Sequence, residues 1–243
     1  MKRKILVLTA VCLSLVHTGV LGEEQARTRL VFDQAHGELP PPGQLEPLAR
    51  KLGLEVQTSS APITAALLEG ARILYLRAPS GEFTDPEAAA IVAFVKGGGS
   101  LLLVLDEERR QPLEKTRVNN IISPFGMRLT LDTEYLHNTG AVAKAGEINK
   151  ADRQVPFSGG RAVEGGTPFA YQLDKEGKPS HPFGAYTRLE KGGRIVVLGE
   201  GMASLFLGDP NAVRLSGDLK TLTPYWGADS AIFMEELLTW LSR

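Results

Sequence analysis

Acidic and imidazole side chains gather directly behind the first apolar segment of this chain. Residues 29–33 read Arg-Leu-Val-Phe-Asp, and Asp33 is followed by His36 and Glu38. Carboxylates and an imidazole held close together can exchange protons, hold a small polar ligand or coordinate a divalent cation. The apolar run is typical of a buried strand, and ligands of open α/β sheets bind beyond the carboxyl ends of strands. The segment therefore predicts a polar site at the end of the first strand.

Two later apolar runs also end in acids. Residues 100–105 are followed by Asp106 and Glu107, and residues 194–198 are followed at a short distance by Glu200. Because parallel strands end at one edge of a sheet, we expect these acids to meet the first group there. The predicted ligand-binding set is Asp33, His36, Glu38, Asp106, Glu107 and Glu200.

Other roles for the same residues stay open. A metal could be held by the carboxylates and the imidazole, but the spacing Asp-x-x-His-x-Glu matches no metal motif with a mechanism behind it. We therefore expect no metal and no cofactor. In a purely structural interpretation Asp33 caps a neighbouring loop, His36 and Gly37 shape the turn, and the other acids face water.

The chain opens with a pattern typical of a signal peptide. Three basic residues, Lys2 to Lys4, precede an apolar run over residues 5–16, and small or modest residues follow at 20–22. The run is too short to cross a membrane comfortably, since a spanning helix needs about 20 apolar residues. We expect residues 1–22 to be cleaved and the protein to be periplasmic or extracellular; an uncleaved anchor is the alternative.

Removal of this leader changes the composition. The formal net charge of −1 becomes −4, because three basic residues and no acids leave with residues 1–22. The single cysteine, Cys12, leaves too, so the remaining chain has no disulfide and no thiol nucleophile. Scattered charges argue against a nucleic-acid partner, because phosphate contacts need clustered Lys and Arg. No second run of 18 apolar residues follows, so we expect no membrane span.

Strand-like and helix-like segments alternate in the first half. Leucines at helical spacing predict a helix near residues 45–52, and Thr84 with Glu87 forms a capping-box pattern that opens a second helix. Strands are predicted at 29–33, 54–58, 72–77 and 100–105. This rhythm predicts right-handed crossovers and a mainly parallel sheet, an α/β flavodoxin-like three-layer sandwich.

The second half is less regular. The pattern predicts a helix over 112–123, a strand over 127–131, an irregular or antiparallel elaboration around 132–190, and a core strand at 194–198. A closing amphipathic helix follows Asp229, its predicted N-cap. We expect a single domain over residues 23–243.

Several of these segments together resemble the class I glutamine amidotransferase-like superfamily. The similarity is to an uncharacterised bacterial branch, related to the N-terminal domain of an intraflagellar transport protein and to auxiliary proteins of gliding-motility ABC transporters. The matching motifs are Phe32-Asp-Gln-Ala-His-Gly-Glu38, Leu52-Gly-Leu54, residues 67–78, Phe94-Val-Lys-Gly-Gly-Gly-Ser-Leu-Leu102, Gly192-Gly-Arg-Ile-Val-Val-Leu-Gly-Glu200 and residues 228–241.

The resemblance implies an architecture without its usual chemistry. Active members use a cysteine at a strand-to-helix turn together with a histidine and a glutamate, whereas this chain has Asp106 after the corresponding strand. We therefore expect an exported, non-catalytic domain that binds a small molecule, glycan or protein partner. The alternative is a hydrolase in which the Asp33, His36 and Glu38 cluster acts as acid, base or metal ligand.

Overall fold

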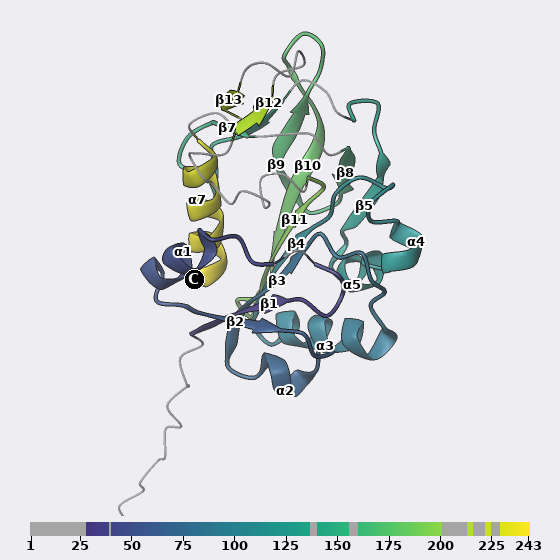
Figure 1. Ribbon diagram of the computed structural model, residues 1–243, viewed down its shortest axis with the longest axis vertical. Helices are drawn as coiled ribbons and strands as arrows, with labels where there is room; N and C mark the ends of the chain where they lie inside the picture. The colour runs from purple at the N-terminus through teal and green to yellow at the C-terminus, as the bar shows by residue number, and fades with distance from the viewer. Residues whose placement is uncertain are drawn as a thin grey trace, which may run out of the picture.

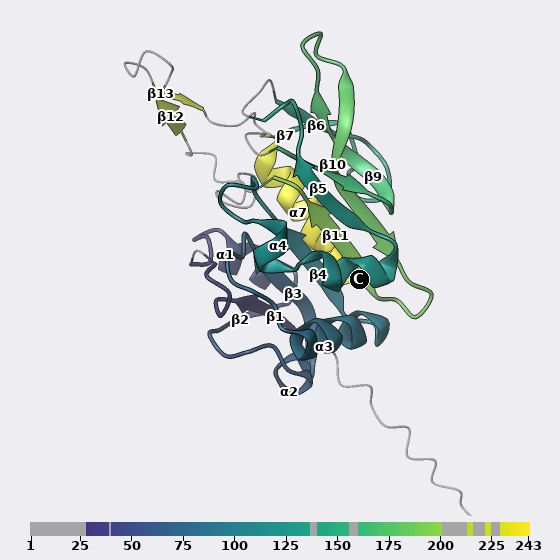
Figure 2. The same ribbon diagram turned by 90° about the vertical axis from the view of Figure 1, so that its right-hand side faces the viewer.

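The computed structural model describes residues 28–38, 40–136, 140–155, 160–200, 213–215, 222–224 and 229–243. The predicted signal peptide, residues 1–22, lies outside the described residues. Helices cover both faces of one large sheet (Figures 1 and 2). Among the described residues, no helix has the length and apolar character needed to span a bilayer.

Within the described part of the chain the sheet has nine strands, and its first half is parallel. Its order is β2 (Glu55–Ser59), β1 (Arg29–Asp33), β3 (Ala71–Arg77), β4 (Ser100–Val104), β11 (Arg194–Leu198), β10 (Pro179–Arg188), β9 (Thr167–Leu173), β6 (Ala141–Ala143) and β7 (Arg153–Val155). Neighbours from β2 to β11 run parallel, and neighbours from β11 to β7 run antiparallel. The flavodoxin-like architecture and the antiparallel elaboration predicted from the sequence are confirmed.

Two apolar layers sandwich the parallel strands. Helices α1 (Leu45–Lys51) and α7 (Ser230–Ser242) cover one face, while α2 (Ala65–Leu68) and α3 (Asp85–Lys96) cover the other (Figure 1). Along β1, Phe32 packs in the first layer and Val31 in the second, because successive side chains of a strand point to opposite faces. Burial on both faces explains why these strands are almost continuously apolar.

The predicted helix over 112–123 is wrong as a single element. Its residues form α4 (Leu113–Thr116) and α5 (Asn119–Ile122), followed by a 3-10 turn, η1 (Ser123–Phe125). Arg117 separates the two helices with a left-handed φ of +57°. Its guanidinium reaches out to Glu82 and Asp85, at 3.0 and 2.5 Å. A residue in this conformation ends a helix, so the chain turns here and starts again.

Smaller elements complete the molecule. The strand predicted at 127–131 is β5 (Arg128–Asp132), but it pairs only with β8 (Arg161–Glu164) in a separate antiparallel ribbon. A second ribbon pairs β12 (Val213–Leu215) with β13 (Leu222–Pro224). Asp229 precedes α7 as predicted, yet its side chain makes no cap hydrogen bond and instead accepts one from the Gln154 amide of β7.

Candidate functional site

The carboxyl end of β1 holds His36 between two carboxylates. Nδ1 of His36 lies 2.6 Å from Asp33 Oδ2, and Nε2 lies 3.1 Å from Glu87 Oε1. The ring also stacks on Phe83, with 3.9 Å between ring centroids. Asp33 uses its other oxygen, Oδ1, to accept a hydrogen bond from the Ala35 amide. Both ring nitrogens of His36 are therefore engaged inside the protein.

Glu38, two residues after His36, folds back to contact the same loop. Its Oε2 accepts a hydrogen bond of 2.9 Å from the His36 amide, and only 8% of the residue is exposed. Burial raises the pKa of Glu38 to about 9, and the neighbouring Asp33 carboxylate adds to the rise. Glu38 therefore keeps its proton at neutral pH.

The charge state of His36 follows from its partners. Burial lowers its pKa, but the hydrogen bond and charge of Asp33, helped by Glu87, outweigh burial and raise it above 6.5. Burial also opposes the charge on Glu87, yet hydrogen bonds from Thr84 and from the Ile63 amide hold its pKa below the ordinary value. The two carboxylates therefore favour the protonated form of the His36 ring that lies between them.

Glu87 is a member of this cluster that the ligand prediction missed. The sequence identified it only as the third residue of a capping box, and that box is confirmed: Thr84 Oγ1 accepts from the Glu87 amide while Glu87 accepts from the Thr84 amide. The same carboxylate then reaches His36, because α3 begins beside the loop that follows β1. The sequence offers no signal for this contact, because His36 and Glu87 are far apart in the chain and only the fold brings them together.

Backbone contacts fix the loop that carries this cluster. The amides of Ser80 and Gly81 both donate to the His36 carbonyl, at 2.9 and 2.7 Å. Gly37 adopts a φ of +77°, and a Cβ there would collide with the Ser80 hydroxyl. The loops after β1 and β3 are therefore closed against each other on the α3 face of the sheet.

Asp106 and Glu107 form a second acidic group at the end of β4. Glu107 Oε1 lies 2.8 Å from Arg110 Nε and 2.7 Å from Arg109 Nη2, and Asp106 Oδ1 accepts from the Glu107 amide. Burial raises the pKa of Asp106, while the nearby Arg110 charge opposes that rise. These acids are thus balanced largely by arginines of their own turn.

Arg161 anchors this second group from the side of β8. Its fully buried guanidinium donates to the carbonyls of Asp106, Gln111 and Thr130, and Nη1 pairs with Glu108 Oε2 at 2.8 Å. Sequence reasoning missed it, because nothing near residue 161 marks a side chain that will pack across the sheet edge.

The predicted ligand residues thus fall into groups. Asp33, His36 and Glu38 lie together, each offering one ligand atom within 4.8 Å of the others. Asp106 and Glu107 form hydrogen bonds within their own turn instead. Glu200 is fully buried two residues beyond β11. A ligand role for the six residues stays a prediction.

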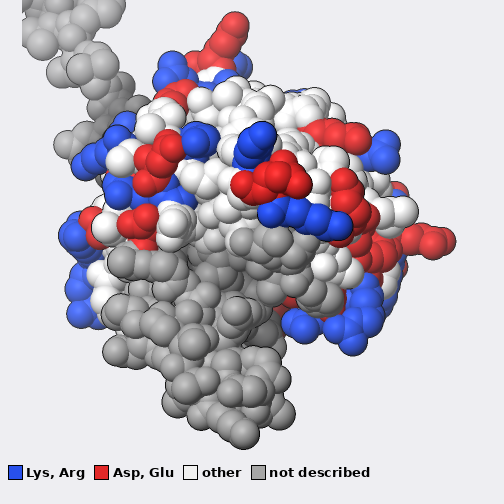
Figure 3. All heavy atoms as spheres, turned by 90° about the horizontal axis from the view of Figure 1, so that it is seen from above, with Lys and Arg blue, Asp and Glu red and all other residues white. Residues whose placement is uncertain are grey.

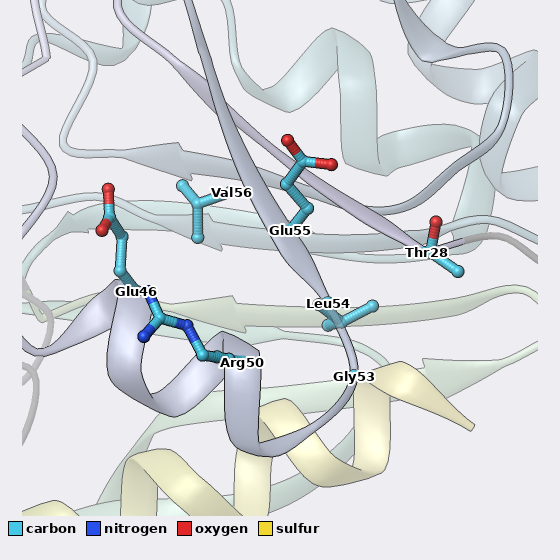
Figure 4. Close-up of a pocket in the computed structure, with 7 residues that line it drawn as sticks. All are labelled: Thr28, Glu46, Arg50, Gly53, Leu54, Glu55 and Val56. Carbon is cyan, nitrogen blue, oxygen red and sulfur yellow. The ribbon is translucent and has the colours of Figure 1, made fainter.

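Two cavities lie away from these residues. One of about 830 Å³ is bordered by β5, β8 and the start of β10, and it includes Leu131, which is 63% exposed, and His181, which pairs with Glu134 at 3.1 Å. The other, of about 550 Å³, is lined by Glu46 and Arg50 of α1 and by residues 53–56 at the amino end of β2 (Figure 4). Acidic and basic side chains are interspersed over the described surface seen in Figure 3.

Comparisons with known proteins agree with this architecture. The mmIFT52 N-terminal domain is 17% identical, with a TM-score of 0.57, over 74% of this chain and 88% of that one. A putative GMP synthase subunit from Thermoplasma acidophilum is 11% identical, with a TM-score of 0.51, over 88% and 94%. Curated protein sequences give no match. The family model of the IFT52 GIFT domain matches residues 29–213, which is most of the chain, and the protein therefore belongs to that family.

Proposed function

We propose that this protein is an exported, non-catalytic binding domain whose partner is another protein. It represents a bacterial branch of the glutamine amidotransferase-like fold that has kept the architecture and lost the thiol chemistry. The observation that carries the non-catalytic part is the His36 ring, whose two nitrogens face Asp33 and Glu87. Membership of the IFT52 GIFT domain family supports an adaptor role.

The geometry of His36 opposes the hydrolase alternative. A general base needs a free ring nitrogen within reach of a substrate proton, and a general acid needs a path for its proton to the leaving group. Here each nitrogen already lies within 3.1 Å of a buried carboxylate. The position after β4, where an amidotransferase nucleophile would stand, holds Asp106, and the only cysteine of the sequence is Cys12.

A protein partner is favoured over a small molecule by the surface beside β5. Leu131 exposes 63% of its surface there, and polar residues surround it: Arg128, Asp132, Glu134 and Glu164. A single exposed leucine is common on protein surfaces, but here it borders a groove of about 830 Å³ whose rim is polar, an arrangement that a protein partner could cover. The associated groove is open and shallow, whereas most small-molecule sites enclose their ligand.

Cross-linking in the native compartment tests this function. A photoreactive amino acid is placed at position 131 and, as a matched control, at exposed Lys51 on the far side of the fold. We expect one discrete protein adduct from position 131 and none from position 51. When the photoreactive amino acid is placed instead at a position beside Leu131, the Leu131→Asp substitution should abolish the adduct. Equal adducts from both positions, or none, would contradict the proposal.

The hydrolase alternative requires the cluster of Asp33, His36 and Glu38 to be catalytic. If it were right, the purified chain would turn over ester, phosphoester or glycoside substrates, and Asp33→Asn or His36→Gln would reduce that rate at least about 100-fold, the usual contribution of an acid–base group. We expect no turnover that responds to either substitution. Glutamine hydrolysis by the protein lacking residues 1–22 would refute the non-catalytic assignment outright.

A further inference from the structure

Arg77 is a buried cation with few partners. It ends β3 and is only 2% exposed. Nη1 donates to the Pro40 carbonyl at 2.8 Å, but Nε is buried without a hydrogen-bond partner, and no carboxylate among the described residues pairs with the guanidinium. Arg161 offers a contrast, because it is equally buried yet donates to three carbonyls and pairs with Glu108.

A charge in this situation is costly to the folded state. Removing a guanidinium from water without a counter-charge is unfavourable, because neither water nor a carboxylate then balances the charge. Burial accordingly lowers the pKa of Arg77, and the opposing influence of Tyr75 does not cancel it. An anion bound at Arg77 would remove this cost, because it would supply both the missing acceptor and the missing charge.

The place of Arg77 in the topology is where such folds bind ligands. From β1 the chain passes through α1 to β2 on one side, then through α2 to β3 on the other side of β1. The order therefore reverses between β1 and β3, and the crevice at that switch point is the usual ligand site of an open α/β sheet. Asp33 and Arg77 end the two strands that flank it.

The two faces of this crevice differ. On the α3 face, the amides of Ser80 and Gly81 close the loop after β3 against His36. Arg77 lies on the other face by the two-residue alternation of the strand, since Tyr75 packs in the layer covered by α1 and α7. Its guanidinium reaches the carbonyl of Pro40, an exposed residue of the loop that leads to α1. The Arg77 guanidinium, with its unpartnered Nε, therefore lies on the α1 side of the switch point.

We propose that Arg77 binds an oxyanion, the carboxylate or phosphate group of a small ligand, at the switch point between β1 and β3. The planar guanidinium fork matches the two oxygens of either group, and Nε together with one Nη is a pair of donors that a bidentate contact uses. The site stands apart from the proposed protein partner, because it needs neither Leu131 nor any second protein.

Thermal unfolding of the purified full chain tests the site with sodium phosphate and sodium acetate as probes. Each is compared with sodium chloride at equal ionic strength. We expect at least one probe to raise the unfolding midpoint saturably, by about 5–10 °C once its free concentration exceeds the dissociation constant about 100-fold. Arg77→Met should lose this response, whereas Arg188→Met, which removes an exposed arginine, should keep it.

The two probes also separate carboxylate from phosphate ligands, since the one that binds more tightly names the preferred group. A response of Arg77→Met equal to that of the wild-type chain, or a wild-type chain that responds to neither probe beyond chloride, overturns the proposal. If Arg77→Met does not fold, the side-chain Nε–H signal that disappears in Arg77→Lys is followed by NMR in the wild-type chain. A change in the chemical shift of that signal on addition of phosphate or acetate supports the site, and an unchanged chemical shift refutes it.

Discussion

At the level of single residues, the loop after β1 contains two side chains whose pKa values are raised. Glu38 keeps its proton up to a pKa of about 9, and Asp33 and Glu87 raise the pKa of His36. The closeness of Asp33, His36 and Glu38 could be predicted from the sequence, because all three belong to one short loop. The contributions of Glu87 and Arg161 could not, since each reaches its partners across distant parts of the chain.

Glu38 should make the protein less stable as the pH rises. In the unfolded chain Glu38 loses its proton near its ordinary value of 4.5, but in the folded protein it keeps the proton to about 9. The folded state therefore binds more protons between these values, and the free energy of unfolding falls as pH rises through them. His36 acts in the same direction above pH 6.5, because its folded pKa is raised.

Replacing this carboxyl group with an amide isolates its effect. Glu38→Gln keeps an oxygen for the His36 amide but cannot ionise, so we expect it to remove a slope of up to about 1.4 kcal/mol per pH unit between roughly pH 5 and 9. Urea unfolding at several pH values measures this slope. Glu46→Gln, on the exposed surface of α1, is the control and should leave the slope unchanged; parallel curves for Glu38→Gln and wild type would contradict the assignment.

At the level of elements, local pattern predicted well wherever one segment decides its own structure. The capping box that opens α3 is such a case, because Thr84 and Glu87 satisfy each other within a single turn. The region 112–123 is the opposite case: its composition fits one helix, but Arg117 adopts a left-handed φ between α4 and α5 and pairs with Glu82 and Asp85. That preference comes from a neighbouring segment, and helical periodicity does not record it.

Arg161 should be the side chain on which the β5–β8 ribbon depends most. It ties β8 to the turn after β4, so Arg161→Met would remove the donor to three carbonyls, two of them in buried contacts, and the cation that pairs with Glu108. We expect a loss of about 3–5 kcal/mol in the free energy of unfolding, measured with urea. Arg128→Met on the exposed side of β5 should cost less than about 1 kcal/mol. A loss below about 1 kcal/mol for Arg161→Met would contradict this role.

At the level of the whole molecule, the alternation of strands and helices was enough to predict the parallel half of the sheet. The partners of the later strands were harder to predict. Short segments such as β6 and β7 pair with strands that are distant in the sequence, and β5 leaves the main sheet to pair with β8. Short alternating segments carry no signal that selects one partner over another.

Export of the protein, with cleavage of residues 1–22, is a prediction that concerns the whole molecule. When the full chain is produced with an active secretion system, we expect the exported product to begin at or near Glu23, as measured by intact mass and N-terminal sequencing. Because Cys12 would be lost with residues 1–22, a reducing agent should then leave the unfolding midpoint unchanged. A product of 26.2 kDa that sediments with membranes would instead identify the leader as a retained anchor.

The two edge strands of the nine-stranded sheet, β7 and β2, differ in the backbone groups that they leave unpaired. At β7 the outward amide, that of Gln154, is already taken by Asp229. At β2 the Glu55 amide and the Ser59 carbonyl form hydrogen bonds with Thr28 and Gln34, which flank β1, so the alternating backbone groups of Val56 and Thr58 point away from β1. We therefore expect any strand-to-strand association between copies through this sheet to use β2 against β2. A symmetric pair joined in this way would cover the β2 edge of both copies, and we expect it to stop at two molecules rather than grow into a filament.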